Sequence, residues 1–261
     1  MPDMTTLVLG ATGKTGRRIV PRLEARGVDV RPGSRAAGFD WDDRSTWAPM
    51  LDGVDVAYVS FFPDLALPGA DETLGAFAAL ARSCGVRRLV LLSGRGEPGA
   101  QRSEAAVQAS GVETTVVRCA WFAQNFSEAF LAEAVASGVV ALPTGDVPEP
   151  FVDAEDIADV AVEALTSAGH GGEVYELTGP RALRFDEAVA EIAIASGRDL
   201  RFVRVSVDEY RAGAPAELAD VITFLFTELL DGRNAEVADG VQRALGRAPR
   251  DFGEFARTTF S

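Results

Sequence analysis

The stretch Thr6-Leu7-Val8-Leu9-Gly10-Ala11-Thr12-Gly13-Lys14-Thr15-Gly16 decides the fold of this chain. Its first four residues are β-branched or apolar, as in a buried strand, and the residues from Arg17 to Arg26 favour a helix. A glycine-rich turn between a strand and a helix allows a phosphate group to approach the N–H groups of the helix N-terminus. The stretch therefore predicts a strand-turn-helix unit that binds a nucleotide.

The first 120 residues continue this alternation of short, strand-like runs and longer amphipathic runs. Such alternation is typical of a parallel sheet built from right-handed crossovers. We predict strands at 6–9, 28–31, 54–60, 87–92 and 113–118, and helices at 15–26, 44–51, 69–83 and 103–109. A glycine follows each predicted helix closely, as is common just after a helix C-terminus. The predicted fold class is α/β, with a doubly wound parallel sheet of the Rossmann type.

After residue 120 the pattern loosens into mixed elements. We predict strands at 138–142, 174–177 and 201–205, helices from 153, at 185–196 and from 251, and helices throughout the region beyond 208. Residues 1–120 are expected to form the Rossmann core, and residues 121–261 a smaller C-terminal lobe that binds the substrate and is interleaved with the core. The apolar segment 221–230 is predicted to be a buried helix of this lobe, with a cover over a ligand or a subunit contact as alternatives.

Composition limits the classes of partner. The formal net charge is −14 and the sequence pI is about 4.6, which disfavour binding to nucleic acids and anionic membranes. The apolar runs are short and no secretion signal is evident, so we expect a cytoplasmic protein that acts on a small molecule. Cys84 and Cys119 are expected to be buried free thiols, and no metal site is expected. A homodimer is compatible with the apolar segment at 221–230.

The glycine pattern itself has two alternatives. Gly10, Gly13 and Gly16 are spaced as in dinucleotide-binding turns, where Thr12, Lys14 and Thr15 are expected to complete the contacts with the pyrophosphate. The segment 13–15 also matches part of the P-loop, but that motif requires glycine where this chain has Val8. A purely structural turn is the other alternative.

The choice of cofactor depends on the end of the second predicted strand. Ser34 and Arg35 follow it, and a hydroxyl beside a guanidinium fork suits the 2′-phosphate of NADP better than a free ribose. Asp29 is the competing acid, but it lies near the start of the strand and is expected to project elsewhere. A solvated Arg35 is the alternative. We therefore predict NADP(H) as the cofactor.

Basic residues limit the mechanism. The chain has 24 arginines and one lysine, Lys14, so no Tyr-x-x-x-Lys pair can donate a proton. The residues four positions after its tyrosines, Tyr58, Tyr175 and Tyr210, are Phe62, Gly179 and Ala214. Reduction of a ketone requires an acid, whereas hydride addition to an iminium carbon requires no proton at that carbon. We predict a reductase for an activated C=N or a conjugated C=C bond.

Several motifs together resemble the NmrA-like group of atypical short-chain dehydrogenases/reductases, most of all the festuclavine and agroclavine dehydrogenases and their bacterial relatives. The resemblance extends over almost the full length. Its motifs are Gly13-Lys14-Thr15, Ser34-Arg35, Phe39-Asp40-Trp41, Thr46-Trp47, Val90-Leu91-Leu92-Ser93, Val117-Arg118, Trp121-Phe122, Asn125-Phe126, Pro150-Phe151-Val152, Asp156-Ile157-Ala158, Gly179-Pro180, Gly246-Arg247 and Pro249-Arg250.

The resemblance implies an NADPH-dependent reductase and roles for further residues. Asp40 and Trp41 would border the adenine, and Phe61-Phe62-Pro63 would lie beside the cofactor. Residues that would face the nicotinamide and the substrate are Ser93, Trp121, Phe122 and Asn125, with Ser93 as a weak catalytic candidate. Ordinary packing, or for Ser93 the end of a strand, is the alternative. The chain departs from many of these reductases because residues 99–102 contain no lysine.

Two other functions stay open. One is a quinone or ketone reductase of the same fold, and the other is a non-catalytic NADP-binding redox sensor with a protein partner. The single histidine, His170, lies in a glycine-rich loop and is expected to be solvated rather than catalytic.

Overall fold

The computed structural model describes residues 4–213, 223 and 225–261, which form two compact units. Unit 1 comprises the described residues of 1–119 together with 154–177 and 239–247, and unit 2 those of 120–153, 178–238 and 248–261. Residues 154–177 and 239–247, which fall in the range of the predicted interleaved lobe, thus belong to unit 1. Two later segments return to the first unit because they complete its sheet and one of its helix layers.

Unit 1 contains a six-stranded sheet in the order β2-β1-β3-β4-β5-β7, in which every neighbouring pair is parallel. Its strands are β1 (Thr5–Leu9), β2 (Asp29–Gly33), β3 (Val56–Val59), β4 (Arg88–Gly94), β5 (Glu113–Cys119) and β7 (Val174–Leu177). The chain moves from β1 to one side and then returns to the other, so the order reverses around β1. Open α/β sheets bind ligands outside the carboxyl ends of their strands at such a point.

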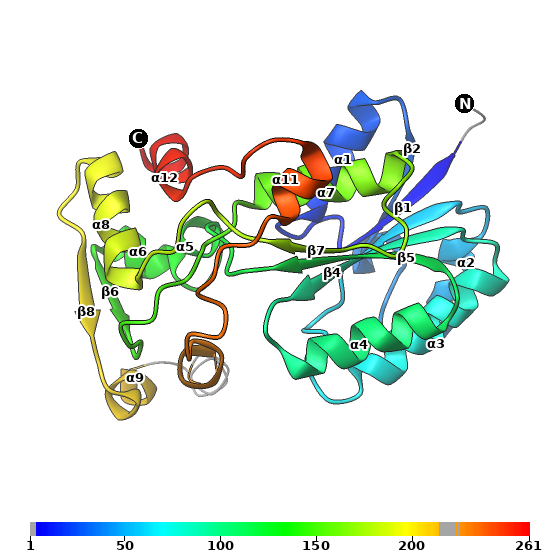
Figure 1. Ribbon diagram of the computed structural model, residues 1–261. Helices are drawn as coiled ribbons and strands as arrows, with labels where there is room; N and C mark the ends of the chain where they lie inside the picture. The colour runs from blue at the N-terminus through cyan, green and yellow to red at the C-terminus, as the bar shows by residue number, and fades with distance from the viewer. Residues whose placement is uncertain (1–3, 214–222, 224) are drawn as a thin grey trace. The chain divides into compact units, whose positions relative to one another are not determined.

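Helices cover both faces of this sheet (Figure 1). Those on one face are α2 (Trp47–Leu51), α3 (Ala70–Ser83) and α4 (Pro98–Ala109), and those on the other are α1 (Gly16–Ala25), α7 (Ala154–Thr166) and α11 (Gly240–Leu245). The predicted doubly wound parallel sheet is thus confirmed. Buried leucines, valines and aromatic residues fill the layer between α3 and the sheet, where Phe77 and Leu74 are almost inaccessible.

The predicted elements of unit 1 differ from the observed ones at their ends. The helix predicted at 103–109 begins at Pro98, because proline suits the first turn of a helix even where the apolar periodicity is weak. The helix predicted at 44–51 is split into a 3₁₀ turn at Arg44–Thr46 and the short α2. A second 3₁₀ turn, Arg35–Ala37, follows β2.

Unit 2 combines a parallel pair of strands with short helices. Its elements are α5 (Asn125–Glu128), α6 (Ala132–Ser137), β6 (Val139–Leu142), α8 (Phe185–Ser196), β8 (Arg201–Arg204), α9 (Val207–Gly213), a π-helical turn at Leu225–Leu229 and α12 (Phe252–Phe260). The sequence did not predict α5 and α6, which are too short for a periodic pattern. Of the segment 221–230, residues 221, 222 and 224 lie outside the described residues, and Phe226 is buried.

The core of unit 2 is aromatic. Phe126, Phe151, Phe185 and Phe252 pack together with ring centroids 5.1–6.0 Å apart. Edge-to-face and tilted contacts of this kind add stability beyond the area they bury. This cluster gives unit 2 a hydrophobic core of its own.

His170 is buried, so the prediction of a solvated side chain is wrong. Its Nδ1 lies 2.8 Å from the hydroxyl of Tyr175, and Thr115 Oγ1 donates to its carbonyl oxygen at 2.7 Å. The loop between α7 and β7 folds against the sheet, which the glycines around the histidine do not reveal. Of the two free cysteines, Cys119 is buried as predicted and Cys84 is half-buried.

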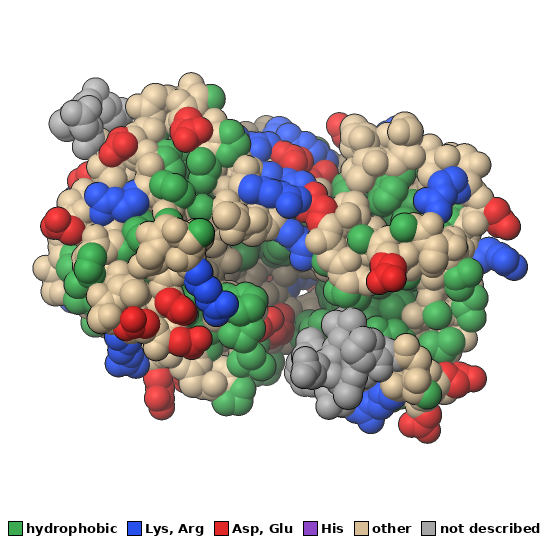
Figure 2. Space-filling view, turned by 180° about the vertical axis from the view of Figure 1, so that it is seen from behind, with side chains coloured by type: hydrophobic (Ala, Val, Ile, Leu, Met, Phe, Trp, Pro, Cys, Tyr) green, Lys and Arg blue, Asp and Glu red, His purple; other side chains and the backbone are tan. Residues whose placement is uncertain are grey.

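On one face of the molecule, charged residues of both signs are intermixed (Figure 2). On the face drawn in Figure 2, basic and acidic side chains lie close to one another among hydrophobic and other residues. Among the described residues, none of the helices combines the length and the hydrophobicity that crossing a membrane would require.

Candidate nucleotide-binding site

The glycine-rich turn lies directly after β1, at the carboxyl edge of the sheet of unit 1. Gly10 has a φ of 71°, and its N–H donates to the carbonyl oxygen of Gly33 at 3.0 Å. A Cβ at Gly16 would overlap the carbonyl oxygen of Gly10 and lie 2.7 Å from the Cα of Ala11. The turn is therefore as tight as its spacing predicts, and Gly16 allows α1 to begin against the backbone of Gly10 and Ala11, directly after β1.

The N-terminus of α1 has neither a side-chain cap nor an acidic residue in its first turn. The N-cap residue, Thr15, makes no side-chain capping bond. Thr15 Oγ1 instead accepts a hydrogen bond of 2.9 Å from the hydroxyl of Tyr58, whose pKa is raised by burial. Since a helix N-terminus attracts negative charge, this end of α1 is suited to a phosphate group.

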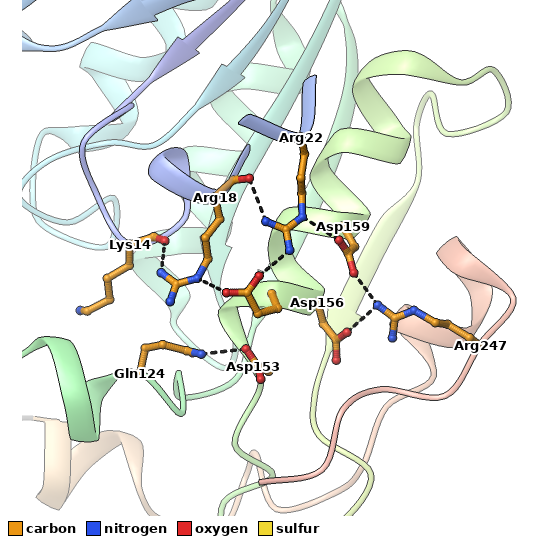
Figure 3. Close-up of polar contacts among 9 residues, drawn as sticks. Lys14, Arg18, Arg22, Gln124, Asp153, Asp156, Asp159 and Arg247 are labelled. Atoms are coloured by element: carbon orange, nitrogen blue, oxygen red, sulfur yellow. Dashed lines mark hydrogen bonds and ion pairs between the residues drawn. The ribbon is translucent and has the colours of Figure 1, made fainter. Parts of the chain in front are cut away.

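Basic side chains continue from this turn along α1 (Figure 3). Arg18 donates to the carbonyl oxygen of Lys14 at 2.7 Å and to Glu155 at 2.6 Å, and Arg22 pairs with Glu155 and with Asp159. In the view of Figure 3 the Lys14 side chain extends away from this network. The arginines thus hold the turn against α7, whereas the lysine ammonium lies apart from that contact.

The structure brings Arg35, Asp40 and Phe62 together. Arg35 Nε lies 3.6 Å from Asp40 Oδ2, and its guanidinium carbon is 5.5 Å from the ring centroid of Phe62. Because β2 and β3 flank β1, Arg35 and Phe62 approach each other across the carboxyl end of β1. Both side chains are about two-thirds exposed, so a ligand can reach them. The Phe62–Pro63 peptide bond beside them is cis, and Pro63 is exposed.

Two residues at opposite ends of β2 have the positions that the cofactor choice required. Ser34 follows β2 directly, and its hydroxyl accepts a bond of 3.3 Å from the N–H of Ala37. Asp29, the competing acid, accepts a bond of 2.8 Å from Thr5 Oγ1 at the start of β2. The strand therefore separates Asp29 from Arg35, as predicted.

Trp41 and Phe61 belong to an aromatic cluster. The ring of Trp41 lies 4.9 Å from Phe39, 4.9 Å from Phe61 and 5.1 Å from Phe77, measured between centroids. The indole N–H of Trp47 donates to the carbonyl oxygen of Asp40 at 2.9 Å. This packing holds the backbone around Asp40, and the half-buried Trp41 and Phe61 leave part of their surface accessible at the same edge.

Ser93 is buried near the end of β4 and is bonded within the protein. Its hydroxyl donates to Glu104 at 2.5 Å, and Glu104 accepts further bonds from Arg118 at 2.5–3.0 Å. These bonds raise the pKa of Arg118, which also contacts Glu176. The arrangement favours the structural alternative for Ser93, and a catalytic role stays a prediction.

The residues predicted to face the substrate lie in unit 2. Trp121 is buried, its backbone N–H donates to the Glu149 carboxylate at 3.2 Å, and its ring packs against Phe185 and Phe226 with centroids 5.4 and 5.1 Å apart. Phe122 and Asn125, the first residue of α5, are half-buried. Their contact with a substrate remains a prediction. Sequence reasoning missed the buried pair beside them, in which Gln124 donates to Asp153 at 2.7 Å.

Sequence reasoning also missed Glu97, in the loop between β4 and α4. Burial, followed by the negative charge of Asp64, raises the pKa of Glu97 to about 7. An acid shortly after the end of a central strand, before Pro98 at the start of a helix, was the only signal in the sequence. That position alone does not distinguish a buried acid from a solvated one.

No family model matches the chain. The chain is 34% identical over 276 residues to a (4-alkanoyl-5-oxo-2,5-dihydrofuran-3-yl)methyl phosphate reductase of Streptomyces griseus, covering 96% of both proteins. It is 31% identical to the NAD(P)H azoreductase of Xenophilus azovorans, again covering 96% of each, and 28% identical to the agroclavine dehydrogenase of Claviceps fusiformis, covering 97% of this chain and 96% of that one.

Solved structures of other proteins share the fold of this chain. The triphenylmethane reductase of Citrobacter sp., solved in complex with NADP(H), superposes with a TM-score of 0.82 at 20% identity, covering 98% of this chain and 100% of that one. NmrA, a negative transcriptional regulator, superposes with a TM-score of 0.74 at 17% identity, covering 99% and 96%. The predicted resemblance is confirmed. The chain belongs to the NmrA-like family of atypical short-chain dehydrogenases/reductases.

Proposed function

We propose that this protein is an NADPH-dependent reductase that transfers hydride to an activated C=N or conjugated C=C bond of a small molecule. The observation that supports cofactor binding most strongly is the turn from Gly10 to Gly16, where the absence of a side chain at Gly16 lets an uncapped helix begin against the strand. Backbone N–H groups at such a turn bind a pyrophosphate.

The predicted contacts divide along the cofactor. Gly10, Thr12, Gly13, Lys14, Thr15 and Gly16 would hold the pyrophosphate. Arg35, with the Ser34 hydroxyl, would bind the 2′-phosphate through a charge-assisted hydrogen bond, and its exposure supports this role. Phe62 and Trp41 offer accessible aromatic surface at the adenine end. When bound, NADPH would supply the hydride, and the protein would supply orientation and exclusion of water.

The missing Tyr-x-x-x-Lys pair bears on the type of bond reduced. Lys14 is the only lysine and belongs to the turn, while Tyr58 donates to Thr15, so neither forms the proton-donating pair of common ketone reductases. The related Streptomyces reductase is named for a 5-oxo-2,5-dihydrofuran, a ring in which a C=C bond is conjugated with a carbonyl group. Both points favour conjugated C=C or C=N substrates over simple ketones. Trp121, Phe122 and Asn125 of unit 2 would contact them.

Two measurements test this function. Calorimetry should detect tighter binding of NADPH than of NADH, and a screen that follows NADPH absorbance should detect consumption with cyclic imines or enones. Absence of NADPH binding would contradict the proposal. Binding without turnover of any substrate would favour the redox-sensor alternative, and turnover restricted to quinones or ketones would favour the other reductase alternative.

A further inference from the structure

Glu97 lies against the last residue of a central strand. Gly94 ends β4, and a Cβ at this position would overlap the Glu97 carboxylate, so the side chain folds back over the strand end. β4 is the neighbour of β3, and both end at the same edge of the parallel sheet as the glycine-rich turn after β1. The carboxyl group is therefore at the edge where the fold binds its ligands.

The segment after β3 covers this loop on one side. Ser103 Oγ of α4 donates to the carbonyl oxygen of Leu65 at 2.6 Å, and a Cβ at Gly99 would overlap the carbonyl oxygen of Ala66. Asp64 belongs to the same segment, and its carboxylate accepts a bond of 2.8 Å from the N–H of Ala66. The close packing of the two loops explains why Glu97 is half-buried.

The charges around Glu97 do not neutralise it. Within residues 4–213, 223 and 225–261, its carboxylate has no ion pair and no side-chain hydrogen bond, in contrast to the neighbouring charges. Arg95 pairs with Glu176 at 3.0 Å, and Glu104 pairs with Arg118. Asp64, the charged group facing Glu97 from the segment after β3, adds negative charge. Burial and like charge both favour the protonated acid, so its pKa is about 7.

We propose that Glu97 is the proton donor of this reductase and completes the reduction of conjugated C=C bonds. The inference rests on the proposed function. When bound, NADPH would supply a hydride to the β-carbon of an enone and be oxidised to NADP+, which would break the C=C π bond and leave an enolate on the substrate. The Glu97 O–H bond then breaks, its proton forms the new C–H bond at the α-carbon, and the carboxylate takes up a proton from water. An acid with a pKa near neutrality suits this transfer.

A pair of substrates separates this role from a structural one. An enone requires the proton, whereas a preformed iminium ion does not. Glu97→Gln should lower kcat for the enone about 100-fold, which is the lower end of the range expected for the loss of a general acid. The same variant should leave NADPH affinity and iminium reduction unchanged. Glu24→Gln, a matched change of an exposed residue near the C-terminus of α1, should alter none of these.

A second readout needs no substrate or cofactor. Carbon-13 NMR of the ligand-free protein should show a glutamate carboxyl that titrates near pH 7, disappears in Glu97→Gln and titrates lower in Asp64→Asn. Unchanged enone reduction in Glu97→Gln, or absence of that resonance, would overturn the role of Glu97. A wild-type protein that neither binds NADPH nor reduces either substrate would instead contradict the proposed function, because the carboxyl titration would still be observed.

Discussion

The loop after β4 and the helix that follows it place two glutamates in opposite surroundings. Glu104 in α4 is almost inaccessible and accepts bonds from Ser93 and Arg118, so its charge is matched. Glu97 in the loop is half-buried and faces the negative charge of Asp64. The two residues have the same chemistry, and the difference teaches that the nearest partner decides whether a buried carboxyl stabilises the fold or holds a proton that it can release.

The opposite face of the sheet repeats the first arrangement. Between α1, α7 and α11, arginines pair with acids, and the buried Asp156 accepts a bond of 2.7 Å from Arg247 (Figure 3). Arg247 also bonds Asp159 at 2.7 Å, and Arg22 shares that acid. The helices on this face thus pack through paired arginines and acids. At the carboxyl edge of the sheet, in contrast, Glu97 has no cationic partner among the described residues and Arg35 is accessible to a ligand.

The largest change in stability is expected at Glu104, whose carboxylate is paired with Arg118. Glu104→Gln should lower the free energy of unfolding by about 3 kcal/mol, since it removes the buried partner of Arg118 and leaves that arginine only its 3.3 Å contact with Glu176. Urea denaturation at pH 7 measures this change. A variant as stable as the wild type would mean that the matched and unmatched acids do not differ in this way.

Replacing Glu97 should have the opposite effect and stabilise the protein at neutral pH. The pKa of Glu97 in the folded protein, about 7, lies above its unfolded value, so its contribution to stability is complete below the unfolded pKa and is lost as pH rises toward 7. Between about pH 4.5 and 7.5, the wild type should therefore lose about 2 kcal/mol relative to Glu97→Gln. Urea denaturation of both proteins at several pH values measures this difference. A difference in unfolding free energy that stays constant across this pH range would refute the raised pKa of Glu97.

A smaller effect is expected where the carboxyl edge binds phosphate. Arg35→Ala should weaken NADPH binding about tenfold and leave NADH binding almost unchanged, because an exposed charge-assisted bond contributes about 1.4 kcal/mol. Calorimetry with both cofactors measures the ratio. Arg102→Ala, a matched change of an exposed arginine of α4, is the control and should alter the binding of neither cofactor. Equal losses for both cofactors would argue against a 2′-phosphate contact.

The smallest change in stability is expected at an exposed ion pair between α1 and α7. Arg26 lies 3.3 Å from Glu163 and is nearly half exposed. Arg26→Ala should change the free energy of unfolding by less than about 0.5 kcal/mol, because solvent screens an exposed pair. A loss of several kcal/mol in thermal or urea unfolding would show that matching contributes to stability even at the surface.

Local patterns were sufficient for the framework of unit 1. The strand at Thr5–Leu9, the turn at Gly10–Gly16 and the order of strands and helices follow from apolar periodicity and glycine spacing, which act over a few residues. The same reasoning anticipated the separation of Asp29 from Arg35, since opposite ends of one strand must diverge. Short elements such as α5 and α6 have too few residues for a period to be recognised.

The sequence by itself therefore determined the parallel sheet, the glycine-rich turn and the residue types at the end of β2. Only the tertiary structure decided that His170 is buried beside Tyr175, that Glu104 is neutralised by Arg118 and that Glu97 is not neutralised. Backbone conformation depends on neighbours along the chain, whereas burial and charge matching are summed over groups that folding brings together from distant parts of it.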